Sequence, residues 1–282
     1  MNKHCLISFI FHKIGPPRFL GDIYSLPVAS FTQFIHQATQ NSCHFVKWSQ
    51  LISGDIKKSE TLFALTFDDG FESDVTQVLP VLQKHKLPAT FFISPDLIGQ
   101  PGYLTWKHVR ILAEAGMTIG SHTLTHAWLP ELSSREIKDE LSISRKMLED
   151  NIGAPINMLS VPGGFYNDRV LEIAKETGYI LVGTSDYGVD QLATNGCKNS
   201  KVLKRNTISL RLSFKDIQTM LLGHIPKKIL VINRLKCCAK KFIKPTRYRQ
   251  MSKYFTVFPF IFDWGVEFEN IQLLVRIIAR CT

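Results

Sequence analysis

Short apolar runs alternate with amphipathic stretches over most of this 282-residue chain. Runs of apolar and β-branched residues with the length of buried strands occur at Leu6–Phe11, His44–Trp48, Leu62–Phe67, Ala89–Ser94, Met117–Gly120, Met158–Val161 and Tyr179–Gly183. Between them, apolar residues at helical spacing predict helices over 30–39, 73–86, 106–115, 134–151 and 168–177. Such alternation is typical of βα units around a parallel sheet, so we predict an α/β fold, either a barrel or an open sheet.

Polar residues, glycine and proline sharpen the expected helix ends. Thr105 and Asn167 each stand where a side chain can cap the first turn of a helix. Ser133 and Glu136 have the spacing of a capping box, which predicts the start of the longest helix. Pro80 is expected to bend the helix that contains it.

No segment has the pattern of a signal peptide or a membrane-spanning helix. The first apolar run, from Leu6 to Phe11, is six residues long and contains Ser8, so we interpret it as a core strand. The longest late run, Phe255 to Phe262, is eight residues and contains a proline. The six cysteines form no CxxC pair, which indicates neither a zinc ribbon nor a disulfide framework and favours a reducing compartment. We therefore expect a cytoplasmic protein, either soluble or peripheral at the inner face of the membrane.

The net charge of +10 comes from one C-terminal segment. Residues 1–216 hold 22 basic and 21 acidic residues, whereas 217–262 hold ten basic residues and no acid. The stretch 227–253 interleaves these charges with apolar residues, which suits an amphipathic helix on an anionic membrane or an acidic polymer. A solvated helix packed on the domain explains the same composition equally well. No nucleic-acid motif accompanies the charge, so no nucleic-acid partner is expected.

Acidic and imidazole side chains stand at the ends of two predicted strands. Asp68 and Asp69 follow one directly, and His122 and His126 follow another. Each pattern alone has an ordinary explanation, since Asp-Asp-Gly forms turns and two histidines four residues apart are often exposed. Because parallel strands end at one edge of a sheet, the two groups are expected to meet. One carboxylate and two imidazoles make an open metal site of the hydrolase type, with a second carboxylate left as a base.

The segments Thr66–Gly70 (TFDDG) and His122–His126 (HTLTH), in this order, closely resemble motifs of the NodB-homology polysaccharide deacetylases, carbohydrate esterase family 4. The resemblance implies a distorted (β/α) barrel over about 1–215, followed by a basic, mainly helical extension over 216–282. It also implies that Asp68 is the base and that Asp69, His122 and His126 hold a divalent metal ion, with zinc expected. The substrate implied is an N-acetylhexosamine-containing polysaccharide or a glycan precursor such as a lipid-linked sugar.

A third family motif, R-x-P-x-G, is altered in this chain. Ser160 stands where the arginine that positions the base would be, followed by Val161-Pro162-Gly163-Gly164-Phe165. Arg205 is a candidate replacement from another strand, although a surface arginine is an equal alternative. The resemblance gives the backbone at Gly163 and Gly164 an oxyanion role, and Pro162 of the same motif is expected near the substrate. The aromatic residues near the motifs can stack on sugar rings, although packing explains them equally well: Trp106, Trp128, Phe165 and Tyr166. Asp186 and Tyr187 are weaker candidates for the rim.

The general acid has two candidates. His224 lies in the short pattern Leu221-Leu222-Gly223-His224, which fits the family's late L-x-x-H motif. A circularly permuted branch, resembling the poly-N-acetylglucosamine deacetylases, carries this histidine on its first strand, where His12 stands here. We favour His12.

Three functions fit these residues. The first is removal of N-acetyl groups from a glycan, and the second is hydrolysis of sugar O-acetyl esters at the same site. The third is sugar binding by a degenerate domain, which the missing arginine at position 160 would explain and the retained metal motif opposes.

Overall fold

The computed structural model describes residues 3–54, 61–193 and 200–242. The chain divides into two compact units, residues 1–231 and 232–282. The domain boundary predicted after residue 215 stays a prediction. The basic stretch predicted at 227–253 is described only as far as residue 242, where helix α8 (Lys227–Phe242) ends. Its membrane contact also stays a prediction.

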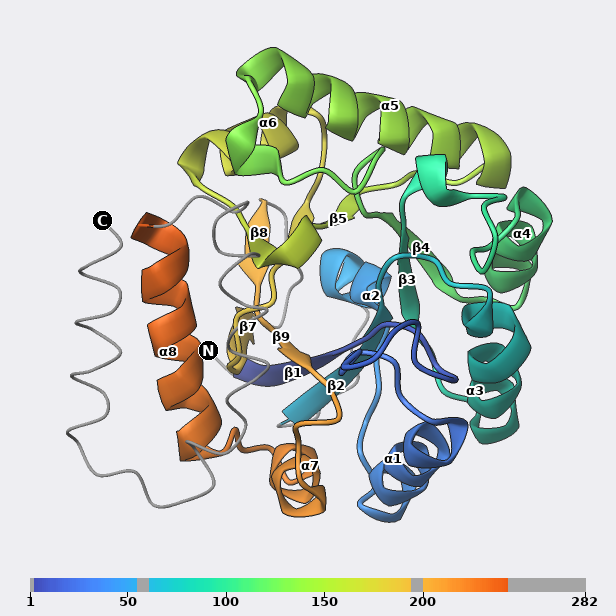
Figure 1. Cartoon of the computed structure of the whole chain (residues 1–282), viewed down its shortest axis with the longest axis vertical. Coiled ribbons are helices and arrows are strands. Elements are labelled where there is room, and N and C mark those ends of the chain that lie inside the picture. Colours follow the sequence, from blue (N-terminus) through green and yellow to red (C-terminus); the bar gives the residue numbers. More distant parts are fainter. Residues whose placement is uncertain (1–2, 55–60, 194–199, 243–282) are drawn as a thin grey trace. The chain divides into compact units, whose positions relative to one another are not determined.

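The strands of the first unit form one sheet that nearly closes into a barrel, with helices around it (Figure 1). The strands are β1 (Lys3–Phe11), β2 (Thr61–Phe67), β3 (Thr90–Ile93), β4 (Thr118–Ser121), β5 (Met158–Ser160), β6 (Leu181–Gly183), β7 (Asp190–Ala193), β8 (Lys201–Leu203) and β9 (Arg205–Thr207). They run in the order β7-β1-β2-β3-β4-β5-β6-β8, and β9 also pairs with β1. All pairings are parallel except that of β7 with β1. Only Lys204 separates β8, which pairs with β6, from β9, which pairs with β1, so this segment joins the two edges.

Helices follow most strands. They are α1 (Val28–Gln40), α2 (Trp48–Ser53), α3 (Leu79–His85), α4 (Trp106–Glu114), α5 (Ser134–Ile152), α6 (Asp168–Glu176), α7 (Phe214–Leu221) and α8. A π-helical turn, η1 (Asp74–Val78), precedes α3, so the helix changes its winding next to Pro80. The predicted caps form: the side chains of Thr105, Ser133 and Asn167 accept hydrogen bonds from the first turns of α4, α5 and α6.

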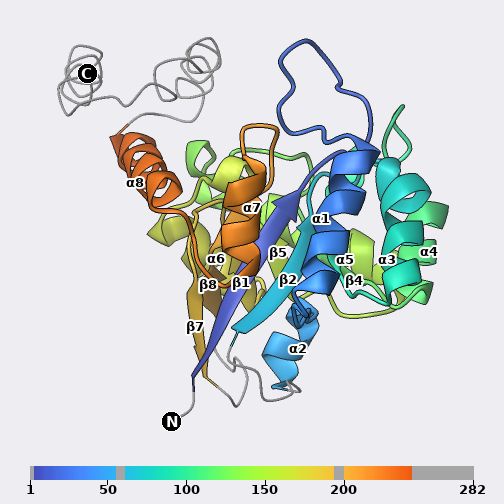
Figure 2. The ribbon, with the colours of Figure 1, turned by 90° about the horizontal axis from the view of Figure 1, so that it is seen from below.

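Successive strand residues point to opposite faces of the sheet, and each face contributes to its own hydrophobic core. One face of the sheet packs against the helices through aromatic residues such as Phe9, Phe11 and Phe91. The other face encloses a smaller cluster that includes Leu6, Trp48 and Phe92. Figure 2 shows α2, which begins with Trp48, at the end of the barrel where β1 and β2 start. Trp48 therefore fills the barrel interior at the end where the strands start. Polar groups occupy the opposite end, where the parallel strands finish.

Two sequence-based assignments differ from the structure. The predicted strand His44–Trp48 is wrong: only Phe45 bridges to Phe63, and α2 begins at Trp48. The helical spacing of Trp48 and Leu51, both buried, outweighs the apolar run before them. The strands β7 to β9 were not anticipated because polar residues such as Arg205 and Asn206 interrupt their apolar pattern.

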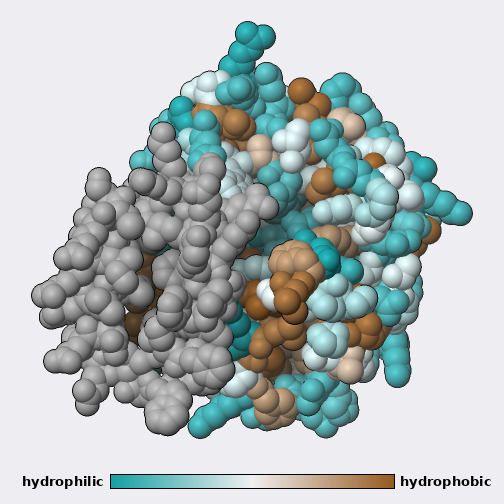
Figure 3. All heavy atoms as spheres, in the orientation of Figure 1, coloured by the Kyte–Doolittle hydropathy of each residue, from teal (hydrophilic) through white to brown (hydrophobic). Residues whose placement is uncertain are grey.

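The loop between β1 and α1 rises above the end of the barrel where the parallel strands finish (Figure 2). It carries exposed apolar side chains, Phe19 and Leu20. On the face shown in Figure 3, apolar residues gather beside a polar hollow. No helix in the described part of the chain is long and apolar enough to cross a bilayer.

Candidate active site

The chemically active side chains predicted from the sequence meet at one end of the barrel. His12 follows β1, Asp68 and Asp69 follow β2, and the His122–His126 segment follows β4. Ser160 ends β5, and Arg205 opens β9. Because the first four strands named are parallel, their carboxyl ends bring these residues together across long stretches of sequence.

Asp69, His122 and His126 form a compact set of three donors. Both Nε2 atoms lie 3.3 Å from Asp69 Oδ1, and the three ligand atoms all lie within 4.8 Å of one another. Asp69 and His126 have left-handed backbones, with φ of 78° and 62°, which turn their side chains towards this point. Burial favours the neutral form of Asp69, but hydrogen bonds with His122 and His126 outweigh it and hold its pKa well below the ordinary value. One carboxylate and two imidazoles at this spacing fit a divalent cation such as zinc.

A hydrogen bond at Nδ1 fixes the orientation of the His122 ring. Its Nδ1 lies 2.8 Å from the main-chain oxygen of Ser160. A carbonyl oxygen only accepts, so Nδ1 carries the hydrogen and a neutral ring presents the lone pair of Nε2 towards Asp69 and His126. Burial lowers the pKa of His122, but the charge of Asp68 and the contacts with Asp69 raise it above the ordinary value.

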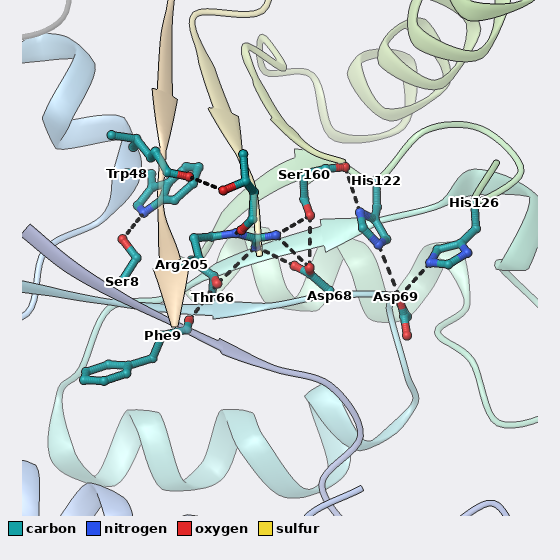
Figure 4. Close-up of polar contacts among 12 residues, drawn as sticks. Ser8, Phe9, Trp48, Thr66, Asp68, Asp69, His122, His126, Ser160 and Arg205 are labelled. Carbon is teal, nitrogen blue, oxygen red and sulfur yellow. Dashed lines mark hydrogen bonds and ion pairs between the residues drawn. The ribbon is translucent and has the colours of Figure 1, made fainter. Parts of the chain in front are cut away.

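Asp68 is buried and held by a guanidinium (Figure 4). Arg205 Nη1 donates to Asp68 Oδ1 at 2.7 Å, and Nη2 donates to Oδ2 at 2.9 Å. The hydroxyl of Ser160 donates to Oδ2 at 3.0 Å. Burial raises the pKa of Asp68, but the charges of Arg205 and His122 outweigh it and lower the pKa below the ordinary value. Asp68 is therefore an ionised carboxylate beside the three donors Asp69, His122 and His126.

Arg205 is 1% exposed, which excludes the alternative of a surface arginine. Its Nε donates to the Thr184 carbonyl at 3.0 Å, and Nη1 also donates to Thr66 Oγ1 at 3.2 Å. The guanidinium carbon lies 5.0 Å from the centre of the Phe92 ring. These contacts fix the position of the guanidinium group that holds Asp68.

The two candidates for the general acid lie at different ends of the barrel. His12 directly follows β1, beside the strand that leads to Asp68, and its ring centre lies 5.1 Å from that of Tyr24. Burial lowers the pKa of His12, against the charges of Asp69 and Asp68. His224 is exposed after α7, and the neighbouring Gly223 lies near Thr61, where β2 begins. The geometry favours His12.

The altered third motif forms one wall beside these groups. Gly163 and Gly164 have φ of 62° and 66°, and a side chain at Gly164 would meet the Ser185 backbone. The ring centres of Trp128 and Phe165 lie 5.6 Å apart. The N–H groups of Gly164 and Phe165 donate to the carbonyls of Val161 and Pro162 within the same turn, and the oxyanion role expected of this backbone stays a prediction. Pro162 is buried in the turn.

The remaining candidates for contact with a substrate fall into two groups. The Tyr166 hydroxyl donates to Asp186 at 3.0 Å, and Tyr166 is partly exposed. Trp106 packs against the core, and the Tyr187 hydroxyl donates to the Thr207 carbonyl at 2.7 Å. The first pair can face a substrate, whereas the second two have structural contacts.

Sequence reasoning missed two residues. The hydroxyl of Ser160 contacts the base, although its position suggested only the loss of a charge. Asp74 is fully buried, and neither of its carboxylate oxygens has a hydrogen-bond partner among the described residues. Burial, with the charges of Asp69 and Asp68, holds the pKa of Asp74 well above the ordinary value. An acid four residues after the Thr66–Gly70 segment gives no distinctive signal in the sequence.

Sequence comparisons connect this geometry with known proteins. A family model described as polysaccharide deacetylase matches residues 55–182. The chain is 30% identical over 160 residues to a peptidoglycan-N-acetylglucosamine deacetylase of Bacillus cereus, covering 53% of this chain and 73% of that protein. It is 32% identical over 140 residues to YxkH of Bacillus subtilis, covering 50% of each protein, so it spans half the length of this relative.

Solved structures show the same fold. A polysaccharide deacetylase from Bacillus cereus matches with a TM-score of 0.69 and 22% identity, covering 78% of this chain and 69% of the other. IcaB from Ammonifex degensii matches with a TM-score of 0.64 and 21% identity, covering 78% of this chain and 96% of the other. At these identities the likeness establishes the fold alone, which confirms the predicted distorted (β/α) barrel.

Proposed function

Because this chain belongs to the polysaccharide deacetylase family, we propose that it is a metal-dependent hydrolase that removes N-acetyl groups from an N-acetylhexosamine-containing glycan. The observation that carries this proposal is the pairing of two sites. A cluster of three donors that fits a metal ion, Asp69, His122 and His126, stands beside an ionised, buried carboxylate at Asp68. Amide hydrolysis needs both, since a carbonyl must be polarised and water must lose a proton.

Asp69, His122 and His126 would hold the divalent ion, for which zinc is our expectation. When bound, the ion would polarise the acetyl carbonyl and make water more acidic. Asp68 accepts the proton of the attacking water, and Arg205 holds its carboxylate in place, in the role that the family's motif arginine has elsewhere. His12 gives a proton to the nitrogen of the leaving amine. Burial lowers the pKa of His12, whereas the charges of Asp69 and Asp68 raise it and so favour the protonated ring that this transfer requires.

The wall beside the site favours a sugar carrying a small acyl group. Trp128 and Phe165 offer aromatic surface, and the turn at Gly163 and Gly164 lets a substrate approach the backbone closely. Tyr166 and Asp186 add hydroxyl and carboxylate groups at a partly exposed position. Sugar hydroxyls bind such groups by hydrogen bonds. A polymer and a lipid-linked precursor both present these features.

Acetate release from N-acetylglucosamine oligomers tests this proposal. We expect release by the metal-loaded protein and none after the metal is removed with a chelator, with recovery when zinc is restored. Sugar O-acetyl esters, tested in parallel, decide between amidase and esterase activity, since the same groups would attack an ester. Metal binding without hydrolysis of either class would support the sugar-binding alternative.

A further inference from the structure

Ser160 lies between the two halves of the site. It is fully buried at the end of β5, which pairs with β4 on one side and with β6 on the other. Its hydroxyl contacts Asp68 and Arg205, and its main-chain carbonyl contacts His122 (Figure 4). One residue thus touches both the proposed base and a proposed metal ligand.

The direction of each hydrogen bond at Ser160 follows from its partners. A guanidinium only donates, so Ser160 Oγ accepts from Arg205 Nη2 at 2.5 Å. The hydroxyl hydrogen is then left for Asp68 Oδ2, 3.0 Å away. A carboxylate accepts and does not donate when ionised, which fits this direction. The hydroxyl of Ser160 therefore has a single orientation, in which it accepts from Arg205 and donates to Asp68.

These bonds make the two oxygens of Asp68 unequal. Oδ2 receives two hydrogen bonds, from Arg205 Nη2 and Ser160 Oγ, which occupy both of its lone pairs. Oδ1 receives one from the described residues, from Arg205 Nη1 at 2.7 Å. The lone pair that remains on the carboxylate is therefore on Oδ1. Without the hydroxyl, Oδ2 would regain a lone pair and both oxygens would be similar.

We propose that Ser160 is a positioning residue, whose hydroxyl directs proton acceptance to Asp68 Oδ1 while its carbonyl orients the metal-binding ring of His122. This inference rests on the proposed function. It also explains why a small residue occupies the position. The guanidinium of Arg205 reaches Asp68 through the space beside β5, and a long side chain at 160 would compete for it.

Matched substitutions separate the hydroxyl from the carbonyl. Ser160→Ala removes the hydroxyl and leaves space, whereas Ser160→Val removes it and fills the space. Ser160→Thr keeps the hydroxyl and has nearly the shape of the valine variant. All three keep the main-chain carbonyl that holds His122, and Arg205 can still hold Asp68. The two apolar variants also differ in volume, so they do not share one route to misfolding.

The experiment measures kcat, KM, bound zinc and thermal unfolding for the wild type and the three variants, with N-acetylglucosamine oligomers as the probe. We expect kcat to fall about 10- to 100-fold in the alanine and valine variants, the range typical of groups that orient catalytic residues. KM and zinc content should stay at the wild-type level in both. The threonine variant should keep a kcat within about threefold of the wild type.

Two results would overturn the inference while leaving the proposed function intact. One is near-normal kcat in the alanine or valine variant. The other is an equal loss in all three variants, which would mean that packing matters and the hydroxyl does not. A wild-type protein that releases no acetate would contradict the proposed function and this inference together.

Discussion

Replacing Arg205 by methionine should strongly destabilise the protein, because Asp68 would remain as a buried charge. The guanidinium donates five hydrogen bonds to groups on four residues. Among the residues that the structure describes, Asp68 would keep only the hydroxyl of Ser160 as a side-chain donor. Removing one partner of a buried ion pair typically costs about 3–5 kcal/mol. For a domain of this size that corresponds to a fall in melting temperature of roughly 6–20 °C.

A double-mutant cycle isolates the interaction between the two side chains. Urea unfolding at neutral pH is measured for Arg205→Met, Asp68→Asn and the double variant. Because the double variant carries no unpaired charge, it should be less destabilised than the sum of the single variants by about 2 kcal/mol or more. Additivity within about 0.5 kcal/mol would refute the account of a coupled buried pair.

The pH dependence gives a second check on the same pair. The pKa of Asp68 is lowered in the folded protein, so the ion pair contributes stability above the ordinary aspartate pKa of about 3.9. This contribution is lost as the pH falls through the folded pKa. The stability difference between the wild type and Arg205→Met should therefore shrink in acid. A difference that stays constant from pH 7 to about pH 3 would contradict the assignment.

Three further predictions concern other parts of the site. His12→Ala should lose nearly all acetate release and keep its metal, whereas His224→Ala, the exposed control, should keep both; near-normal turnover of His12→Ala would end the proposed acid role. The pKa of Asp74 is raised in the folded state, so above about pH 4 its ionisation destabilises the folded protein. Asp74→Asn should therefore melt at a higher temperature than the wild type at pH 7, and this gain should vanish in acid. An equal gain at both pH values would contradict this prediction. Gly164→Ala should lower the free energy of unfolding, measured in urea, by about 1–3 kcal/mol, and by more than Gly153→Ala does. Both glycines have a positive φ, but only at Gly164 would a Cβ lie 2.8 Å from the backbone nitrogen of Ser185. Equal losses in the two variants would show that this contact does not matter.

The sequence predicted the parts of the fold that depend on local pattern. Continuous apolar runs such as Leu62–Phe67 and helix signals such as Ser133 and Glu136 act within a few residues, and the structure has the expected elements there. The segment at His44–Trp48 was mistaken because a short apolar run suits either a strand or the start of a helix. Only the barrel interior, which Trp48 fills, decides between them.

The site was predictable only as far as its motifs extend. Asp68, Asp69, His122 and His126 each follow a strand, and parallel topology brings them together. The role of Ser160 depends on Arg205, which is 45 residues away and lies on a strand with no apolar signature. Contacts of this kind form only when the sheet closes, so no local sequence pattern predicts them.

Metal content and acetate release, measured together on the wild type and Asp69→Ala, test the central claim most directly. Asp69 Oδ1 lies 3.3 Å from both imidazole nitrogens, so its removal takes away the carboxylate of the three-donor cluster found among the described residues. We predict about one divalent ion per wild-type chain, acetate release from N-acetylglucosamine oligomers, and loss of both in the variant. A wild-type protein without stoichiometric metal, or an Asp69→Ala protein that still releases acetate, would contradict the account.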